Sequence, residues 1–265
     1  EELGVQEEHL ALVGAQGVRQ VDRHDDKAPV QRPRSFRRAL ISNVDLVDFA
    51  SEIVRQGPGD FFRLVAHYSY KDFPDYRYFT KEHDTKILEE GMRRVTDTSI
   101  PEDEAFRVVE KQLVPAWIEA TKGGIRKFWH EYFYDLIRAI DKSKHQGKTE
   151  ECWLLAAAEG NIPMVVPGYE DSTFGNIFAS HVKLGDASAN IAKSGIEYMG
   201  VFYDQYQKLS EGAGVGFFQI GGGIAGDFPI CVVPSIKYDM KIPVKPWAYF
   251  CQISDSTTSY GSYSG

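Results

Sequence analysis

Three loop segments of the sequence carry residue types that could bind a phosphate or an amine. The first, Gly221–Gly226, follows an apolar run and satisfies G-x-G-x-x-G, in which missing side chains let a pyrophosphate approach backbone amides at a helix start. No acidic residue lies about 20 residues beyond it, where a ribose contact is expected. A glycine turn needed only for packing therefore explains the spacing equally well, and both interpretations stay open.

Asp227 follows these glycines and precedes Phe228 and Pro229. A carboxylate just before a proline suited to the first helical turn is a natural helix N-cap. The same carboxylate could bind the ammonium group of a substrate. One residue could do both.

The other two segments, residues 169–176 and 254–265, are rich in carboxylates and hydroxyls. In the first, Asp171 or Ser172 could bind a ligand or simply cap the following helix. In the second, the hydroxyls could hydrogen-bond ribose and phosphate, or belong to a flexible tail. His181 could act as an acid or base, although a lone histidine on a helix is more often structural. No spacing of His, Cys, Asp or Glu indicates a metal site.

Composition narrows the class of ligand. The 265 residues carry a net charge of −8, which gives no sign of a broadly basic nucleic-acid surface. After residue 150 all six basic residues are lysines, and this part holds 15 of the 24 glycines. An acidic, glycine-rich half without arginine suits a cationic substrate. The arginines of residues 1–40 are more typical of a solvated surface than of an RNA-binding arm.

The cysteines and the apolar runs indicate the compartment. Three cysteines without a CxxC pair favour a reducing, cytoplasmic setting over a disulfide framework or a zinc ribbon. No apolar run approaches the roughly 18 residues of a membrane span. We therefore expect a cytoplasmic protein with no membrane and no nucleic-acid partner.

Alternating helix and strand patterns after residue 150 predict the α/β class. Apolar strands separated by helices indicate a parallel sheet with right-handed crossovers. Ligands bind such sheets beyond the carboxyl ends of the strands, where the three loop segments lie. The predicted helices are 152–159, 173–182 and 196–209, with a further short one before the last strand, and the predicted strands are 162–166, 216–220 and 247–253.

The first half reads as mostly helical. Residues 10–14 resemble a strand entering a turn, and the rest of residues 1–40 reads as loop. A helix is expected over 43–54, and another opening at a capping box in residues 99–102. The inward face of this second helix would be Ala105, Val108, Val109, Leu113, Ala116 and Trp117. A third, over 126–142, is rich in aromatic residues, which suit core packing better than a stacking platform for bases.

The three loop segments together resemble the deoxyhypusine synthase family, in particular its bacterial branch. The resemblance runs from Ile100 to Gly265 and extends weakly to residues 64–67. It implies a Rossmann-like parallel sheet flanked by helices in three α/β/α layers, in a homotetramer with NAD and substrate at a dimer interface. It also implies aminobutyl transfer: spermidine is oxidised, and its butylimine passes to an enzyme lysine and then to an acceptor amine. The acceptor is a lysine of translation initiation factor 5A in the true synthases, and a small polyamine in relatives that make homospermidine.

The resemblance assigns roles by position. The cofactor residues it implies are Asp171, Gly222, Gly223, Asp255, Ser256, Gly261, Ser262 and Ser264. The substrate positions differ from the eukaryotic pattern: Asn176 and Tyr263 stand for aspartates, Asp227 for a histidine, Cys231 for an asparagine and Gln252 for a tyrosine. These differences favour another amine donor or acceptor over spermidine and the initiation factor.

The nucleophilic lysine of the family lies in a W-G-K segment beyond the position of Gly265, and the family's N-terminal cofactor segments are not recognisable here. We expect a poorly defined segment 1–40 followed by one domain, residues 41–265. The leading hypothesis is an NAD-dependent transferase acting on spermidine or putrescine. The alternatives are a homospermidine synthase, a catalytically inactive subunit that retains the fold, and a generic dehydrogenase.

Overall fold

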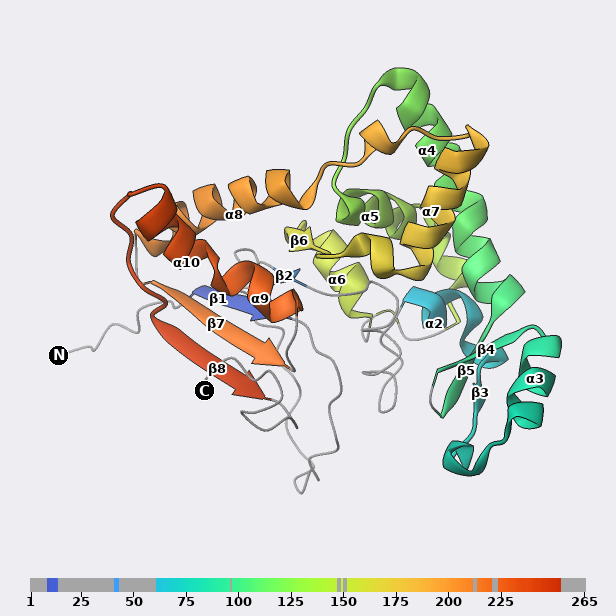
Figure 1. Cartoon of the computed structure of the whole chain (residues 1–265). Helices are drawn as coiled ribbons and strands as arrows, with labels where there is room; N and C mark the ends of the chain where they lie inside the picture. Colours follow the sequence, from blue (N-terminus) through green and yellow to red (C-terminus); the bar gives the residue numbers. More distant parts are fainter. Residues whose placement is uncertain are drawn as a thin grey trace. The chain divides into compact units, whose positions relative to one another are not determined.

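The structure, a computed structural model, describes residues 9–13, 41–42, 61–95, 97–146, 149, 152–211, 214–220 and 224–253 (Figure 1). The chain divides into two compact units, each described by itself. Unit 1 comprises residues 1–49, 160–168 and 193–265, and unit 2 comprises residues 50–159 and 169–192. The expected division into a segment 1–40 and one domain 41–265 stays a prediction, and the helix expected over 43–54 lies outside the described residues.

Unit 1 contains a five-stranded sheet. Its strands are β1 (His9–Val13), β2 (Ile41–Ser42), β6 (Met164–Val165), β7 (Val215–Ile220) and β8 (Tyr249–Ile253). They lie in the order β6-β2-β1-β7-β8, and every neighbouring pair is parallel. Counted along the chain, this order reads 3-2-1-4-5, so it reverses direction between β1 and β7. The α/β class is confirmed, whereas the three-layer, Rossmann-like arrangement remains a prediction.

The predicted strands of unit 1 are present, with two changes of length. The strand expected over 162–166 is reduced to Met164–Val165, which lies between Pro163 and Pro167; proline lacks the N–H that a strand interior needs. β8 begins at Tyr249, because Trp247 instead packs edge-on against Tyr206 and Phe217, with ring centroids 4.7 and 5.1 Å apart.

Unit 1 also contains α8 (Gly195–Ser210), α9 (Ile224–Ile230) and α10 (Val232–Pro234), and then a π-helical turn, Ser235–Asp239. The predicted helix 196–209 is confirmed as α8. It opens with a capping box, in which the Ser194 hydroxyl accepts from the Glu197 N–H at 3.2 Å and the Glu197 carboxylate accepts from the Ser194 N–H at 2.8 Å. Its buried face repeats at helical spacing through Tyr198, Phe202 and Tyr206.

Unit 2 is mainly helical and contains a small antiparallel sheet. Its helices are α2 (Phe61–Ala66), α3 (Lys81–Glu89), α4 (Arg107–Gly123), α5 (Trp129–Ala139), α6 (Trp153–Glu159) and α7 (Thr173–Leu184). The strands β3 (Lys71–Asp72), β4 (Met92–Val95) and β5 (Thr98–Pro101) pair in the order β3-β5-β4. The predicted helices 152–159 and 173–182 are confirmed as α6 and α7.

The capping box predicted at residues 99–102 is wrong. Ser99, Ile100 and Pro101 form the end of β5, where Ile100 pairs with Arg93. A proline pushes the residue before it into the extended region, so Pro101 favours a strand at Ile100 over a helix N-terminus. The helix begins after this proline as a π-helical turn, Glu102–Phe106, which continues into α4.

The inward face predicted for this helix is correct in four of its six positions. Val108 is half-buried and Ala116 is exposed. The buried residues are Ala105, Val109, Leu113 and Trp117. The third predicted helix is shorter than expected, Trp129–Ala139, and its Tyr132, Phe133 and Tyr134 are at most 3% exposed. The core-packing interpretation of these aromatics is therefore confirmed.

Phe174 anchors α7 in an aromatic core. Its ring contacts those of Phe62, Phe106 and Phe133, with centroid separations of 6.0, 6.5 and 5.4 Å. These three residues belong to α2, the turn before α4, and α5. The start of α7 is thus fixed against three other elements of unit 2.

The substitution Phe174→Ala should lower the free energy of unfolding by about 3–5 kcal/mol, because it leaves a cavity where four elements meet. Leu184→Ala, on the same helix but 73% exposed, should change it by less than about 0.5 kcal/mol. Urea unfolding followed by circular dichroism measures both. Equal losses for the two variants would contradict this description of the core.

Candidate functional site

The residues predicted for the site fall into three groups. The first group lies outside the described residues and consists of Gly222, Gly223, Asp255, Ser256, Gly261, Ser262, Tyr263 and Ser264. Asp171 and Asn176 belong to unit 2. Asp227, Cys231 and Gln252 belong to unit 1.

In unit 2, Asp171 is the exposed last residue of a short 3-10 turn, Tyr169–Asp171, just before α7. Of the two residues considered as helix caps, Ser172 is the one that caps: its hydroxyl accepts from the Gly175 N–H at 2.9 Å. The carboxylate of Asp171 is therefore not used as the cap of α7.

Asn176 closes the turn that carries Asp171. Its side-chain Nδ2 donates to the carbonyl oxygens of Ser172 at 2.8 Å and Glu170 at 3.4 Å. Since both bonds are made by Nδ2, the amide oxygen Oδ1 is the atom of this side chain that could accept from an amine.

Gly175 and Tyr169 fix the same turn from inside. A Cβ at position 175 would lie 2.1 Å from the Tyr169 carbonyl oxygen, so only glycine fits there. The ring of Tyr169 is 4% exposed and stacks on that of Trp129, with centroids 3.9 Å apart and planes at 16°. The turn that presents Asp171 is thus held by backbone, cap and aromatic contacts together.

In unit 1, α9 begins at Ile224, immediately after the three consecutive glycines. The N-cap predicted at Asp227 is therefore wrong, because the helix starts three residues earlier and both Asp227 and Pro229 lie within it. Asp227 instead occupies the first turn, where a carboxylate interacts favourably with the helix dipole. Its Oδ1 is buried and has no hydrogen-bond partner among the described residues.

Gly226, the last glycine of the motif, packs α9 onto β7. A Cβ there would lie 2.5 Å from Nε2 of Gln219. This agrees with the role of the third glycine in dinucleotide-binding loops, which is close packing of helix and strand. It also fits the alternative of a packing turn, and residues 221–223, where a ligand would bind, lie outside the described part.

Gln219 is a residue that our sequence reasoning missed. It is fully buried, and it pairs in register with the predicted site residue Gln252. The available signal was an amide in the penultimate position of an otherwise apolar strand.

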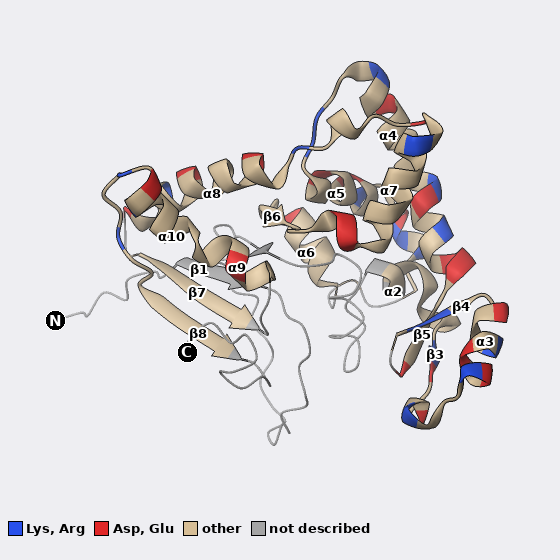
Figure 2. Cartoon of the chain, in the orientation of Figure 1, with Lys and Arg blue, Asp and Glu red and all other residues tan. Residues whose placement is uncertain are grey.

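The other two predicted site residues of unit 1 differ in exposure. Gln252 is half-buried and Cys231 is exposed. β7 and β8 carry no charged residue, whereas basic and acidic residues alternate along α4 (Figure 2).

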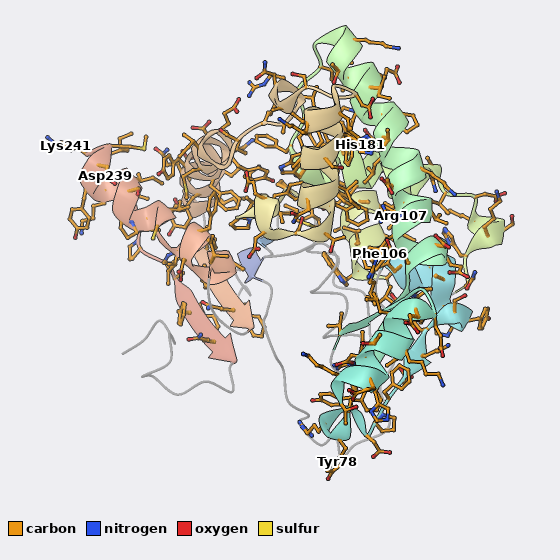
Figure 3. The ribbon with its side chains drawn as sticks, turned by 45° about the vertical axis from the view of Figure 1, so that its right-hand side comes forward. Tyr78, Phe106, Arg107, His181, Asp239 and Lys241 are labelled. Atoms are coloured by element: carbon orange, nitrogen blue, oxygen red, sulfur yellow. The ribbon has the colours of Figure 1, made fainter. Side chains whose placement is uncertain are left out.

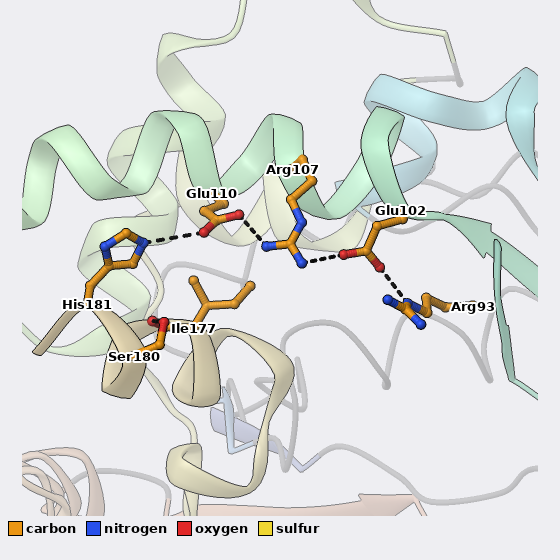
Figure 4. Close-up of polar contacts among 7 residues, drawn as sticks. All are labelled: Arg93, Glu102, Arg107, Glu110, Ile177, Ser180 and His181. Atoms are coloured by element: carbon orange, nitrogen blue, oxygen red, sulfur yellow. Dashed lines mark hydrogen bonds and ion pairs between the residues drawn. The ribbon is translucent and has the colours of Figure 1, made fainter. Parts of the chain in front are cut away.

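His181 belongs to a chain of polar contacts in unit 2. Its Nδ1 lies 2.8 Å from Asp186 and its Nε2 lies 3.3 Å from Glu110, which in turn pairs with Arg107 at 2.5 Å (Figure 4). Arg107 also forms an ion pair with Glu102, at 2.5 Å, and Glu102 forms one with Arg93, at 2.6 Å. Arg107 and His181 lie along the contact of α4 with α7 (Figure 3). The structural interpretation of His181 is the one that these contacts favour.

Glu110 is held in its ionised form within this chain of polar contacts. Partial burial acts to raise the pKa of Glu110, but hydrogen bonds from Arg107 and His181 outweigh it, so the pKa lies below its usual value. Because only 20% of the Glu110 side chain is exposed, solvent screens these contacts incompletely.

In the described part of the chain, every helix is too short or too polar to span a membrane. Within the same ranges, no group of three or more His, Cys, Asp or Glu side chains could hold a metal ion.

Comparison with protein families gives a match. Residues 60–265 match the family model described as deoxyhypusine synthase. The match covers more than half of the chain. It includes the turn that carries Asp171 and the segment from β7 to α9, residues 215–230, which forms the β7–α9 corner. No curated protein matches the chain.

The substitution Gly175→Ala should lower the free energy of unfolding by about 1–3 kcal/mol, because the new methyl group overlaps a backbone oxygen that cannot move freely. Gly200→Ala provides the control, since a Cβ at this exposed position of α8 meets nothing within 4 Å. That change should be neutral or stabilise by up to about 1 kcal/mol. Thermal unfolding of both variants tests the pair, and a neutral Gly175→Ala would contradict the close contact.

The substitution Glu110→Gln should cost about 1–3 kcal/mol at pH 7, because it breaks charge-assisted hydrogen bonds to Arg107 and His181. The folded pKa of Glu110 is lowered, so its contribution is fully present above the unfolded value of about 4.3 and is lost as pH falls through the folded value. The difference between wild type and variant should therefore shrink in acid.

Denaturant unfolding at pH 7 and below pH 4 measures this difference. Glu119→Gln is the control, because Glu119 is an exposed residue of the same helix, and it should show little effect at either pH. A cost of Glu110→Gln that stays constant into acid would refute the role given to its charge.

Proposed function

The chain belongs to the deoxyhypusine synthase family, and we propose that it is an NAD-dependent aminobutyl transferase acting on a polyamine, of the bacterial branch of that family. The observation that carries the proposal is the family match over residues 60–265, together with the motif residues within it. Family membership supports a transferase of polyamine chemistry. The choice of donor and acceptor belongs to the proposal.

The sheet of unit 1 supports the cofactor. The strand order 3-2-1-4-5 matches five of the six positions in the 3-2-1-4-5-6 order of dinucleotide-binding sheets, which bind their ligand where the order reverses, here between β1 and β7. The glycines that follow β7 and the close packing of Gly226 fit such a loop. These observations favour a Rossmann-like sheet, and the three α/β/α layers belong to the proposal. The residues that would hold NAD are Gly222, Gly223, Asp255, Ser256, Gly261, Ser262 and Ser264, with Asp171 for the ribose.

NAD would accept the hydride when a carbon next to an amine is oxidised. The protein must then hold the amine by its charge. Asp227 suits this task, because its Oδ1 is buried without a hydrogen-bond partner in the described part of the chain and an ammonium group would provide one. The further substrate positions that we propose are Asn176, Cys231, Gln252 and Tyr263.

The acceptor that we propose is a small amine. Oxidation of putrescine yields an imine; a second putrescine displaces ammonia, and return of the hydride gives homospermidine. With spermidine as donor, the leaving group is 1,3-diaminopropane. The acceptor could instead be a protein lysine, as in the true synthases, and the substitutions at the substrate positions argue against that choice. A cytoplasmic homotetramer with NAD at a dimer interface completes the proposal.

The experiment incubates the intact protein with NAD and either putrescine or spermidine. Mass spectrometry should find homospermidine or 1,3-diaminopropane, and absorbance at the nicotinamide band should show no net accumulation of reduced cofactor, because the hydride returns to the product. Asp227→Asn should lower the rate at least about tenfold, which is about 1.4 kcal/mol of lost transition-state stabilisation.

Three other results are distinguishable. Net reduced nicotinamide without a transfer product would indicate a dehydrogenase. NAD binding by calorimetry without any product would indicate a catalytically inactive subunit that retains the fold. Neither binding nor product would refute the proposal.

A further inference from the structure

Near the carboxyl ends of β7 and β8, one face of the sheet changes from aromatic to amide side chains. Phe217 and Phe250 are paired in register and stack, with centroids 5.4 Å apart and planes at 17°. Two residues further on, Gln219 pairs with Gln252. Because alternate residues of a strand share a face, the glutamines lie on the same face as the phenylalanines. This face is covered by α9, whose Ala225 packs in a buried cluster with Phe217.

Gln219 is an unusual residue for this position. It is 0% exposed, and burying an amide costs about 1–3 kcal/mol unless its hydrogen bonds are made. An apolar side chain would fill the same place in the strand without needing any hydrogen bond. A role for the amide group itself explains why glutamine stands here.

Helix α9, which packs on this face, leaves space for the amide group of Gln219. A Cβ on Gly226 would lie 2.5 Å from Nε2, 2.7 Å from Cδ and 2.9 Å from Oε1 of Gln219. All three atoms belong to the amide group, so the missing side chain of Gly226 provides its space. The amide therefore lies against the backbone of the first turn of α9.

Asp227 is the next residue of that turn. The position of the Gln219 amide consequently sets where the Asp227 backbone lies relative to the carboxyl end of β7. The buried Oδ1 of Asp227 lacks a hydrogen-bond partner within the described residues, and a buried carboxylate oxygen needs a donor. A primary ammonium group is a donor of matching charge.

We propose that Gln219 is a positioning residue whose amide fixes the first turn of α9 and thereby holds Asp227 where it accepts a primary alkylammonium. The identity of the ligand rests on the proposed function. The effect on α9 rests on the packing alone, so the two parts can fail separately.

The test compares Gln219→Met with the wild type, because methionine keeps the length of the side chain and removes the amide. Gln207→Met is the matched control: Gln207 lies on α8 in the same unit, and its Nε2 donates to the Tyr203 carbonyl at 3.2 Å. Hydrogen exchange of residues 224–230 in the ligand-free protein and calorimetric titration with putrescine are the two measurements. Gln219→Met should speed the exchange and raise the putrescine Kd, each at least about tenfold, and Gln207→Met should change neither.

A second variant disturbs the same contact and serves if Gln219→Met fails to fold. Gly226→Ala leaves Gln219 chemically intact but displaces its amide, so it should give the same two effects. Gly200→Ala, in the same unit and with open space around it, should give none. Combining Gly226→Ala with Gln219→Met should weaken putrescine binding no further than either change alone, because both act through one contact.

Exchange of residues 224–230 that is unchanged in Gln219→Met would overturn the inference, and so would an unchanged putrescine affinity when the wild type binds. If the wild type binds no putrescine, the proposed function fails. Hydrogen exchange alone then decides the role of Gln219.

Discussion

In each of the two units, a glycine near the start of a helix lets that helix approach a neighbouring segment more closely than any side chain would allow. Gly175 of α7 lies against the carbonyl of Tyr169, and Gly226 of α9 lies against the amide of Gln219. The positions of Asp171 and Asp227 depend on these two contacts, since each aspartate is close in sequence to one of them. Such contacts tolerate little change, because packed interiors leave no room for an added methyl group.

The sequence allowed the class of the fold and most of its later elements to be predicted, because apolar periodicity is strong in buried strands and helices. It failed at Ile100 and Asp227 for local reasons. At Ile100 the following proline imposed an extended backbone where Ser99 suggested a cap, and at Asp227 the helix had already started after the glycines. Neither start position is visible from a cap pattern alone, since serine and aspartate fit both a cap and a turn.

The site residues stay predictions. Composition and resemblance to a known family singled out the loops that carry them, and of this only the family is confirmed, for residues 60–265. Gln219 was missed because a single polar residue in an apolar strand carries no periodic signal. The pairing of His181 with Glu110 was also invisible in the sequence, because Glu110 is 71 residues away from it along the chain. Long-range pairs of this kind depend on the packing of α4 against α7.

The central claim is that the β7–α9 corner holds the amine of a substrate beside a dinucleotide. The most direct measurement is a crystal structure of the intact protein with NAD and putrescine. We expect the pyrophosphate to lie against residues 221–223 and a putrescine ammonium to lie within hydrogen-bond distance of Asp227. Both ligands bound elsewhere, or Asp227 paired with a protein donor while putrescine is bound, would contradict it.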